Sequence, residues 1–318
     1  MRNSASFNRH VVKGGETMVT LDSLISQAAS KKGPVVAVAS AADREVLEAV
    51  SIASEKGIAS FMLFADERRI SEMIQKNFPW LLDNEKISIH HAEDESHAAA
   101  LSVKAVSSGQ AHVLMKGNLA TSTILKAVLN GDYGLRTGKI LSHVAAFEVA
   151  GYDRLLFVTD AAMNIAPSLE AKAQIIRNAV ATAHACGVLE PIVAPLAAVE
   201  TVNPAMTPTT DAASLVVMNR RGQITGCIVD GPLALDNAVS EKAAAQKGIT
   251  GETAGKADIL VVPNIEAGNI LYKSLMYFAN AKVGAIIQGA KAPIVLTSRA
   301  DSAESKLYSL ALAILSIK

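Results

Sequence analysis

Residues 35–64, VVAVASAADREVLEAVSIASEKGIASFMLF, decide the fold class. The stretch begins with an apolar run rich in Val and Ala, and it ends with a second apolar run at residues 60–64. Between them, residues 43–56 carry apolar side chains at helical spacing, and Gly57 follows where a helix would end. Alternating strands and helices of this kind are typical of strand–helix–strand units, in which the two strands lie parallel in one sheet. The sequence therefore predicts an α/β fold.

The same alternation continues along the rest of the chain. Nearly continuous apolar runs of this kind are expected when helices cover both faces of a sheet. The other predicted strands are residues 87–90, 111–115, 155–158, 192–199, 224–229, 259–262, 284–287 and 294–296. The other predicted helices are residues 67–78, 96–108, 168–186, 211–219, 240–246, 269–278 and 302–317. We expect a three-layer α/β/α architecture with mainly parallel sheets.

A chain of 318 residues is long enough for two domains, at about 150 residues per domain. The polar, aperiodic residues 1–18 predict a flexible N-terminal extension. We expect a first α/β domain at residues 19–145, completed by residues 291–318, and a second α/β domain at residues 146–290.

The composition excludes several classes of protein. Thirty Lys and Arg balance thirty Asp and Glu, so bulk charge does not favour binding to nucleic acid. Half of the residues are hydrophobic and 19% are charged, which excludes a disordered chain. The two cysteines lie far apart, and no apolar run reaches the ~18 residues of a membrane helix. We expect a cytoplasmic protein that binds neither nucleic acid nor membrane.

The common motifs for nucleotide, metal and hydrolase sites are absent. No GxGxxG follows the first predicted strand, and neither GxxxxGK[ST] nor GxSxG occurs. His90 and His91 are adjacent, and no HExxH motif places histidines at zinc-ligand spacing. Asp160, Asp211 and Asp230 have the chemistry for Mg²⁺, but turns and caps explain each of them equally well. We therefore predict no metal site.

Polar groups follow five of the predicted strands directly. Because ligands bind at the carboxyl ends of strands in open α/β sheets, these groups predict a polar cleft. Cations combined with loop amides are what a phosphate group needs. The candidates are Lys116, Arg136, Lys139, Lys273 and Arg299 as cations, Asn118, Asn264 and Asn269 as amides, and Thr121, Thr297 and Ser298 as hydroxyls.

Six blocks together resemble the phosphate acetyl/butyryltransferase family, and they are most similar to its butyryl branch. They are KGNLATSTILKAVLN, GLRTGKILSHVAAFE, DRLLFVTDAAMNIAPSLEAK, GQITGCIVDGPLALDNAVSEKAA, GKADILVVPNIEAGNILYKSL and APIVLTSRADSAESKLYSLALA. The resemblance extends from about Val35 to the C-terminus. It implies two α/β domains like those of isocitrate and isopropylmalate dehydrogenases, with the active site in the interdomain cleft.

The resemblance also implies an activity. Members of the family transfer a short acyl group reversibly between CoA and inorganic phosphate through a ternary complex. CoA and acyl-CoA are substrates, no cofactor is bound permanently, and members usually form homodimers. The resemblance leaves butyryl and acetyl open as the preferred acyl group, with butyryl favoured. Two more distant alternatives are a metal- and NAD-dependent decarboxylating dehydrogenase of similar fold and a non-catalytic binder of acyl phosphates or CoA.

The resemblance assigns roles to individual residues. It places the family's serine–arginine pair on Ser298, which would stabilise the oxyanion, and on Arg299, which would hold the phosphate. Ser305 stands where the acetyl branch has a catalytic carboxylate, so Glu304 and Asp301 are the candidates for the general base. The residues expected to bind substrate are Arg136, Lys116, Asn118, Thr121, Asp230, Asn264, Glu266, Asn269 and Lys273.

Overall fold

The computed structural model describes residues 19–251, 253–298 and 301–317. The chain divides into two compact units. The split unit combines Leu21–Ala146 with the residues from Lys282 onward. The other unit, called the continuous unit after its main segment Phe147–Ala281, also takes in residues 19–20 of the described chain. Residues 282–290, which the sequence analysis assigned to the second domain, are grouped with the split unit.

The split unit contains a seven-stranded sheet in the order β3-β2-β1-β4-β11-β10-β5. The strands are β1 (Val35–Ala39), β2 (Ser60–Ala65), β3 (Ile87–His91), β4 (Val113–Lys116), β5 (Ser142–Glu148), β10 (Lys282–Gln288) and β11 (Ile294–Val295). Parallel pairing joins β3, β2, β1, β4 and β11, and β10 runs antiparallel to β11. Two strands from the end of the chain therefore stand between β4 and β5.

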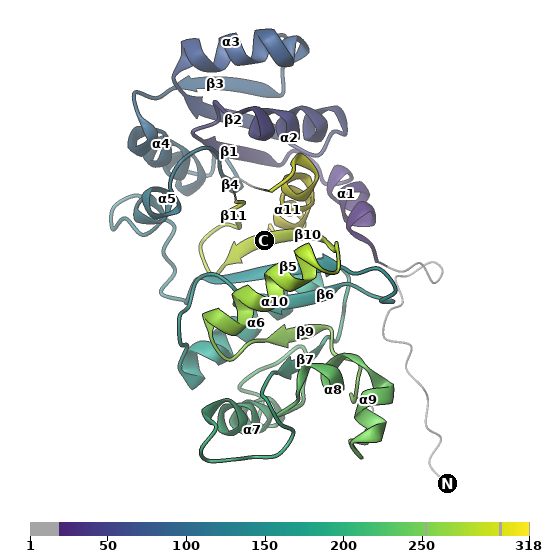
Figure 1. The fold of residues 1–318 in the computed structure, drawn as a ribbon. Coiled ribbons are helices and arrows are strands. Elements are labelled where there is room, and N and C mark those ends of the chain that lie inside the picture. Colours follow the sequence, from purple (N-terminus) through teal and green to yellow (C-terminus); the bar gives the residue numbers. More distant parts are fainter. Residues whose placement is uncertain (1–18, 252, 299–300, 318) are drawn as a thin grey trace. The chain divides into compact units, whose positions relative to one another are not determined.

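Six α-helices of the split unit cover this sheet. They are α1 (Leu21–Ala29), α2 (Arg44–Glu55), α3 (Glu67–Asn77), α4 (Glu95–Ser107), α5 (Thr121–Val128) and α11 (Ala303–Leu315), together with the 3₁₀ turn η1 (Pro79–Leu81). Asp43, Asp66 and Asp94 accept the orphan N–H groups at the starts of α2, α3 and α4. The last helix, α11, packs against β10 and α1 (Figure 1) and buries every residue from Ser305 to Leu315. It is the core helix of this unit.

The continuous unit contains a parallel sheet in the order β6-β9-β7-β8. Its strands are β6 (Leu156–Thr159), β7 (Ile192–Pro195), β8 (Ile228–Val229) and β9 (Ile259–Val261). Its helices are α6 (Leu169–Ala185), α7 (Thr207–Arg220), α8 (Leu235–Val239), α9 (Glu241–Gln246) and α10 (Ile265–Tyr277). Ser168, Ser240 and Asn264 accept the first free N–H groups of α6, α9 and α10.

The structure confirms the predicted α/β fold and its mainly parallel sheets. It also corrects several boundaries. The helix predicted at residues 269–278 begins earlier, at Ile265, because Asn264 caps it. The strand predicted at residues 224–229 is reduced to Ile228–Val229. None of the helices in the described residues combines the length and the apolar character that a membrane crossing needs.

Candidate functional site

Ser298 and Asp301, the Ser298–Asp301 pair, lie between the carboxyl end of β11 and the start of α11. The backbone N–H of Ser298 donates to Oδ2 of Asp301 at 2.7 Å, and the backbone N–H of Asp301 donates to the carbonyl of Ser298 at 3.2 Å. The Ser298 residue is exposed. These bonds fix Ser298 immediately before α11. Arg299, its predicted partner, lies outside the described residues.

Lys306, within α11, supports the Ser298–Asp301 pair. The sequence analysis did not predict a role for Lys306. Its Nζ atom donates a hydrogen bond to the main-chain carbonyl of Asp301, and the residue is 3% exposed. The sequence held one signal for it. The run that follows Lys306 is apolar on every side of the predicted helix and has no polar face. A helix that is apolar all round is a buried one.

Lys116 ends β4 and Asn118 lies in the loop that follows, at the same edge of the sheet as Ser298. Ile294 pairs with Leu114 and Val295 with Met115, so the residues after β11 emerge beside those after β4. Lys116 is 5% exposed and donates from Nζ to the carbonyl of Gly117 at 3.1 Å. Thr121 begins α5 and is exposed. This edge therefore gathers three predicted residues: Lys116, Asn118 and Ser298.

Ser40, which follows β1, locks this loop in place and was not predicted. The backbone N–H of Asn118 donates to the carbonyl of Ser40 at 2.9 Å, and Oγ of Ser40 donates to the carbonyl of Asn118 at 3.1 Å. Ser40 has φ 56°, in the left-handed region that non-glycine residues seldom adopt. A Cβ atom on Gly117 would lie 2.2 Å from the carbonyl oxygen of Ser40. Only glycine fits at position 117.

The structure places the backbone around Arg136 at the other end of β11. Lys291, which precedes β11, donates its backbone N–H to the carbonyl of Leu135 at 2.9 Å. Thr137 donates its hydroxyl to the carbonyl of Gly289 at 2.5 Å. Arg136 itself is exposed. The structure therefore does not bring the backbone of Arg136 to the edge where Ser298 lies.

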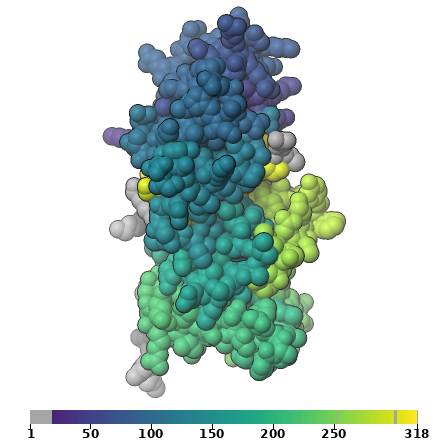
Figure 2. Space-filling model, turned by 90° about the vertical axis from the view of Figure 1, so that its left-hand side faces the viewer, coloured from purple at the N-terminus to yellow at the C-terminus, as the bar shows by residue number. Residues whose placement is uncertain are grey.

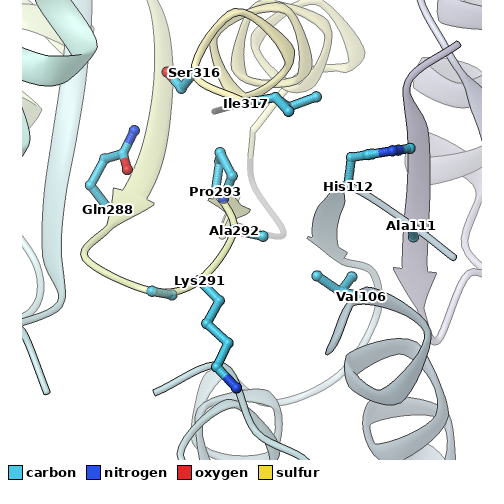
Figure 3. Close-up of a pocket in the computed structure, with 10 residues that line it drawn as sticks. Val106, Ala111, His112, Gln288, Lys291, Ala292, Pro293, Ser316 and Ile317 are labelled. Atoms are coloured by element: carbon cyan, nitrogen blue, oxygen red, sulfur yellow. The ribbon is translucent and has the colours of Figure 1, made fainter. Parts of the chain in front are cut away.

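A cavity of about 200 Å³ lies beside this second edge, next to the segment that joins β10 to β11 (Figure 3). Its wall includes Val106, His112, Lys291, Pro293 and Ile317. Nδ1 of His112 accepts the backbone N–H of Val35 at 3.1 Å, and Nζ of Lys291 donates to the carbonyl of Gly134 at 3.4 Å. Among the residues of this wall that the structure describes, Lys291 alone carries a permanent charge, so the cavity does not gather charges for an anion.

The carboxylate of Glu304 belongs to a cluster on the opposite side of α11 from the contacts of the Ser298–Asp301 pair. The Tyr308 hydroxyl donates to Oε1 of Glu304 at 2.8 Å, and Nζ of Lys282 lies 3.9 Å from the same oxygen. Asp22 accepts from Lys282 at 3.1 Å. Burial raises the pKa of the Tyr308 hydroxyl, and its hydrogen bond to Glu304 raises it further. Asp301 rather than Glu304 contacts Ser298.

In the continuous unit, α10 carries three predicted residues, and a fourth, Asn264, caps its start. Oδ1 of Asn264 accepts the backbone N–H of Ala267 at 3.0 Å and so caps the helix. Gly268 lies against the loop after β6, where an added Cβ would come within 2.8 Å of Cα of Ala161. Glu266, Asn269 and Lys273 are exposed, and their spacing puts them on one face of the helix.

Two aspartates stand after other strands of the continuous unit. Asp160 follows β6, is 2% exposed, and accepts hydrogen bonds from the backbone N–H groups of Ala162, Met163 and Asn164. Asp230 follows β8 and accepts a hydrogen bond from the hydroxyl of Thr253. Both carboxylates thus organise loops.

The described part of the chain offers neither a cluster of metal ligands nor a cysteine that would be ionised at neutral pH. There, no cluster of three or more His, Cys, Asp or Glu side chains could hold a metal ion. Burial raises the pKa of Cys186 to about 12, and burial raises that of Cys227 to about 11. Both thiols are protonated at neutral pH.

Comparisons with known proteins show which family this chain resembles. The family model for phosphate acetyl/butaryl transferase matches residues 80–314. A Bacillus subtilis protein named probable phosphate butyryltransferase is 58% identical over 294 residues, which are 92% of this chain and 97% of that protein. The phosphate acetyltransferase of Thermotoga maritima is 46% identical over 292 residues, which are 92% of this chain and 98% of that protein.

A solved structure agrees with these relatives. The crystal structure of a branched-chain phosphotransacylase from Enterococcus faecalis V583 matches with a TM-score of 0.78 at 38% identity. The match covers 89% of this chain and 99% of that one. Sequence and structure therefore agree with the resemblance carried by the blocks around residues 230–236, 263–269 and 296–302. The chain belongs to the phosphate acetyl/butyryl transferase family.

Proposed function

We propose that this protein transfers a short acyl group reversibly between CoA and inorganic phosphate, with butyryl preferred. Membership of the family carries the proposal. The proposed substrates are acyl-CoA and phosphate, and the reaction needs no permanently bound cofactor. We place the enzyme in the cytoplasm, where these substrates are found. The names of the relatives include butyryl, acetyl and branched-chain acyl groups, so the acyl preference is the finer part of the proposal.

The proposed step forms a C–S bond and breaks a C–O bond. The CoA thiolate attacks the carbonyl carbon of the acyl phosphate, and inorganic phosphate leaves. The thiol has an ordinary pKa of about 8.5, so a base or a cation must favour its ionised form at neutral pH. The aligned binding of two substrates supplies much of the acceleration.

The exposed Ser298 fits the role of oxyanion donor. Attack on the carbonyl carbon builds negative charge on the carbonyl oxygen, and a fixed hydroxyl stabilises that charge. Two hydrogen bonds to Asp301 hold the backbone of Ser298, which carries this hydroxyl. The proposed role of Arg299, the next residue, is to hold the phosphate, and Lys116 adds a cation at the same edge of the split unit.

The general base is the part of the mechanism for which two candidates compete. Asp301 contacts Ser298, whereas the carboxylate of Glu304 is held by Tyr308 near Lys282. These contacts favour Asp301.

The experiment is a panel of acyl-CoA substrates from acetyl to hexanoyl, with isobutyryl included and phosphate as the acceptor. Release of CoA is followed with a thiol reagent. We expect the highest kcat/KM with butyryl-CoA. The highest value with acetyl-CoA would favour an acetyltransferase, and no CoA release from any substrate would overturn the proposed function.

Arg299→Ala tests the site in the same assay. We expect this variant to keep its fold and to lose acyl transfer by orders of magnitude. Arg69→Ala is the matched control, because Arg69 is an exposed arginine on α3 of the same unit. Near-wild-type turnover of Arg299→Ala would refute the site assignment.

We further propose that the protein is a homodimer and that α10 contributes to its interface. Gly268 is the buried residue of this helix, while Ile270 is 66% exposed, and Tyr277 and the following Phe278 are 72% and 87% exposed. Figure 2 shows, in yellow-green, that this part of the chain reaches the surface. Exposed apolar surface of this kind marks interaction sites.

Light scattering after size-exclusion chromatography tests the dimer. We expect twice the mass of one chain for the wild type and a shift toward the single-chain mass for Ile270→Asp. Leu189→Asp changes an equally exposed apolar residue of the continuous unit, one that lies outside α10, and is expected to leave the mass unchanged. A wild-type protein with the mass of one chain would refute the dimer.

A further inference from the structure

Lys306 is a charged residue inside a helix that is otherwise buried and uncharged from Ser305 to Leu315. It is 3% exposed, so its ammonium group has lost nearly all of its contact with water. No ion pair joins it to a carboxylate among the described residues. A buried charge without a counter-charge is costly, and an apolar side chain of similar volume would be more stable there. The presence of lysine therefore calls for another reason.

The hydrogen bond from Lys306 supplies that reason. Its ammonium group donates to the main-chain carbonyl of Asp301, and Asp301 holds Ser298 by two further bonds. One bond uses the Asp301 carboxylate and the other its backbone N–H. Three hydrogen bonds thus link Lys306, in the core of the split unit, through Asp301 to Ser298.

Charge strengthens the same arrangement. A hydrogen bond whose donor is charged is roughly twice as strong as a neutral one. The positive charge also lies against the main chain of Asp301, the residue that binds Ser298. A charge shielded from water acts more strongly on a nearby anion than an exposed one. It therefore favours the phosphate that the proposed reaction brings to Ser298.

We propose that Lys306 is a positioning residue for acyl transfer, which fixes Asp301 and through it Ser298, and which favours the phosphate group beside them, an inference that rests on the proposed function. Lys306 acts through Asp301 and does not itself touch the substrate.

The test compares Lys306→Met with Lys306→Arg. Methionine keeps most of the length of the side chain but has neither a donor nor a charge, while arginine keeps both. We expect Lys306→Met to lower kcat with butyryl-CoA at least tenfold and to raise the KM for phosphate. Lys306→Arg should recover most of both. A side chain that served packing alone would give the opposite order, because methionine fits an apolar core better than arginine does.

Lys172→Met is the matched control. Lys172 is another buried lysine, 2.7 Å from Asp211 in the continuous unit. At a temperature where circular dichroism shows every variant to be folded, we expect Lys172→Met to keep the wild-type kcat. Wild-type kcat and KM in Lys306→Met, or equal losses in the two methionine variants, would overturn the proposal.

Hydrogen exchange provides a readout that does not depend on activity. Without the Lys306 bond, the backbone N–H groups of Ser298 and Asp301 should exchange faster, while those of β1 stay unchanged. Unchanged exchange at Ser298 and Asp301 would overturn the positioning role even if the wild type released no CoA. If the wild type released no CoA but exchange were faster in Lys306→Met, the proposed function would be refuted. The support that Lys306 gives to Ser298 and Asp301 would still be established.

Discussion

The hydroxyl of Thr137 donates a hydrogen bond to the main-chain carbonyl of Gly289, with 2.5 Å between the two oxygens. Together with the bond from Lys291 to Leu135, it ties both neighbours of Arg136 to the segment before β11. Ser298 follows β11. The two predicted phosphate-site residues thus stand at opposite ends of one strand in the split unit.

This placement predicts unequal roles for the two arginines of the site. We expect both variants to lower kcat, and we expect kcat of Arg136→Ala to stay at least tenfold above that of Arg299→Ala, because Arg299 adjoins Ser298 in the sequence. The measurement is phosphorolysis of butyryl-CoA at saturating phosphate. Equal losses in the two variants would show that Arg136 also reaches the reacting phosphate.

The two carboxylates before and within α11 should also differ. Asp301→Ala removes the acceptor of the Ser298 N–H, so we expect kcat to fall at least tenfold. Glu304→Gln keeps an acceptor for the Tyr308 hydroxyl, and we expect kcat to stay within about twofold of the wild type. The same assay measures both variants. The reverse order would identify Glu304 as the base and contradict the geometry.

Gly117 should not tolerate a side chain. In Gly117→Ala, the new Cβ would lie 2.2 Å from the Ser40 carbonyl oxygen and 2.6 Å from that of Ala39, so the loop after β4 must move. We expect the free energy of unfolding, measured by urea denaturation, to fall by about 1–3 kcal/mol. Gly131→Ala is the control, since nothing lies within 4 Å of a Cβ there. Equal stability of the two variants would disprove the close contact.

The cysteines should have no part in the reaction. Burial raises the pKa of Cys227 to about 11, so only about one thiol in a thousand is ionised at pH 8. We expect iodoacetamide to leave activity intact at pH 8, and labelling by mass spectrometry to increase as the pH rises toward 11. Rapid inactivation at pH 7 would show a thiolate that the structure does not contain.

The sequence predicts the repeating elements well, because each strand and helix is encoded locally. The apolar run at residues 60–64 became β2, at Ser60–Ala65, and the helical spacing of residues 43–56 became α2, at Arg44–Glu55. In the structure, the backbone positions of Lys116, Asn118 and Ser298 lie at one edge of the split unit. Their role in binding substrate stays a prediction.

Long-range order could not be predicted in the same way. Nothing local indicates that residues 282–288 and 294–295 insert between β4 and β5, because strand order depends on partners far away in the chain. The position of the Arg136 backbone follows from that insertion. Burial of Lys306 depends equally on what α11 packs against, which the spacing of its own residues does not specify.

The strand order has a consequence for synthesis on the ribosome. The continuous unit has all of its strands once residue 261 has been made, whereas the split unit waits for β10, β11 and α11 from the last 37 residues of the chain. Until then, the edges of β4 and β5 lack their partners, and open strand edges pair with other chains. A nascent chain arrested after Ala281 would therefore hold one finished unit and one half-built unit with open strand edges that are prone to aggregation.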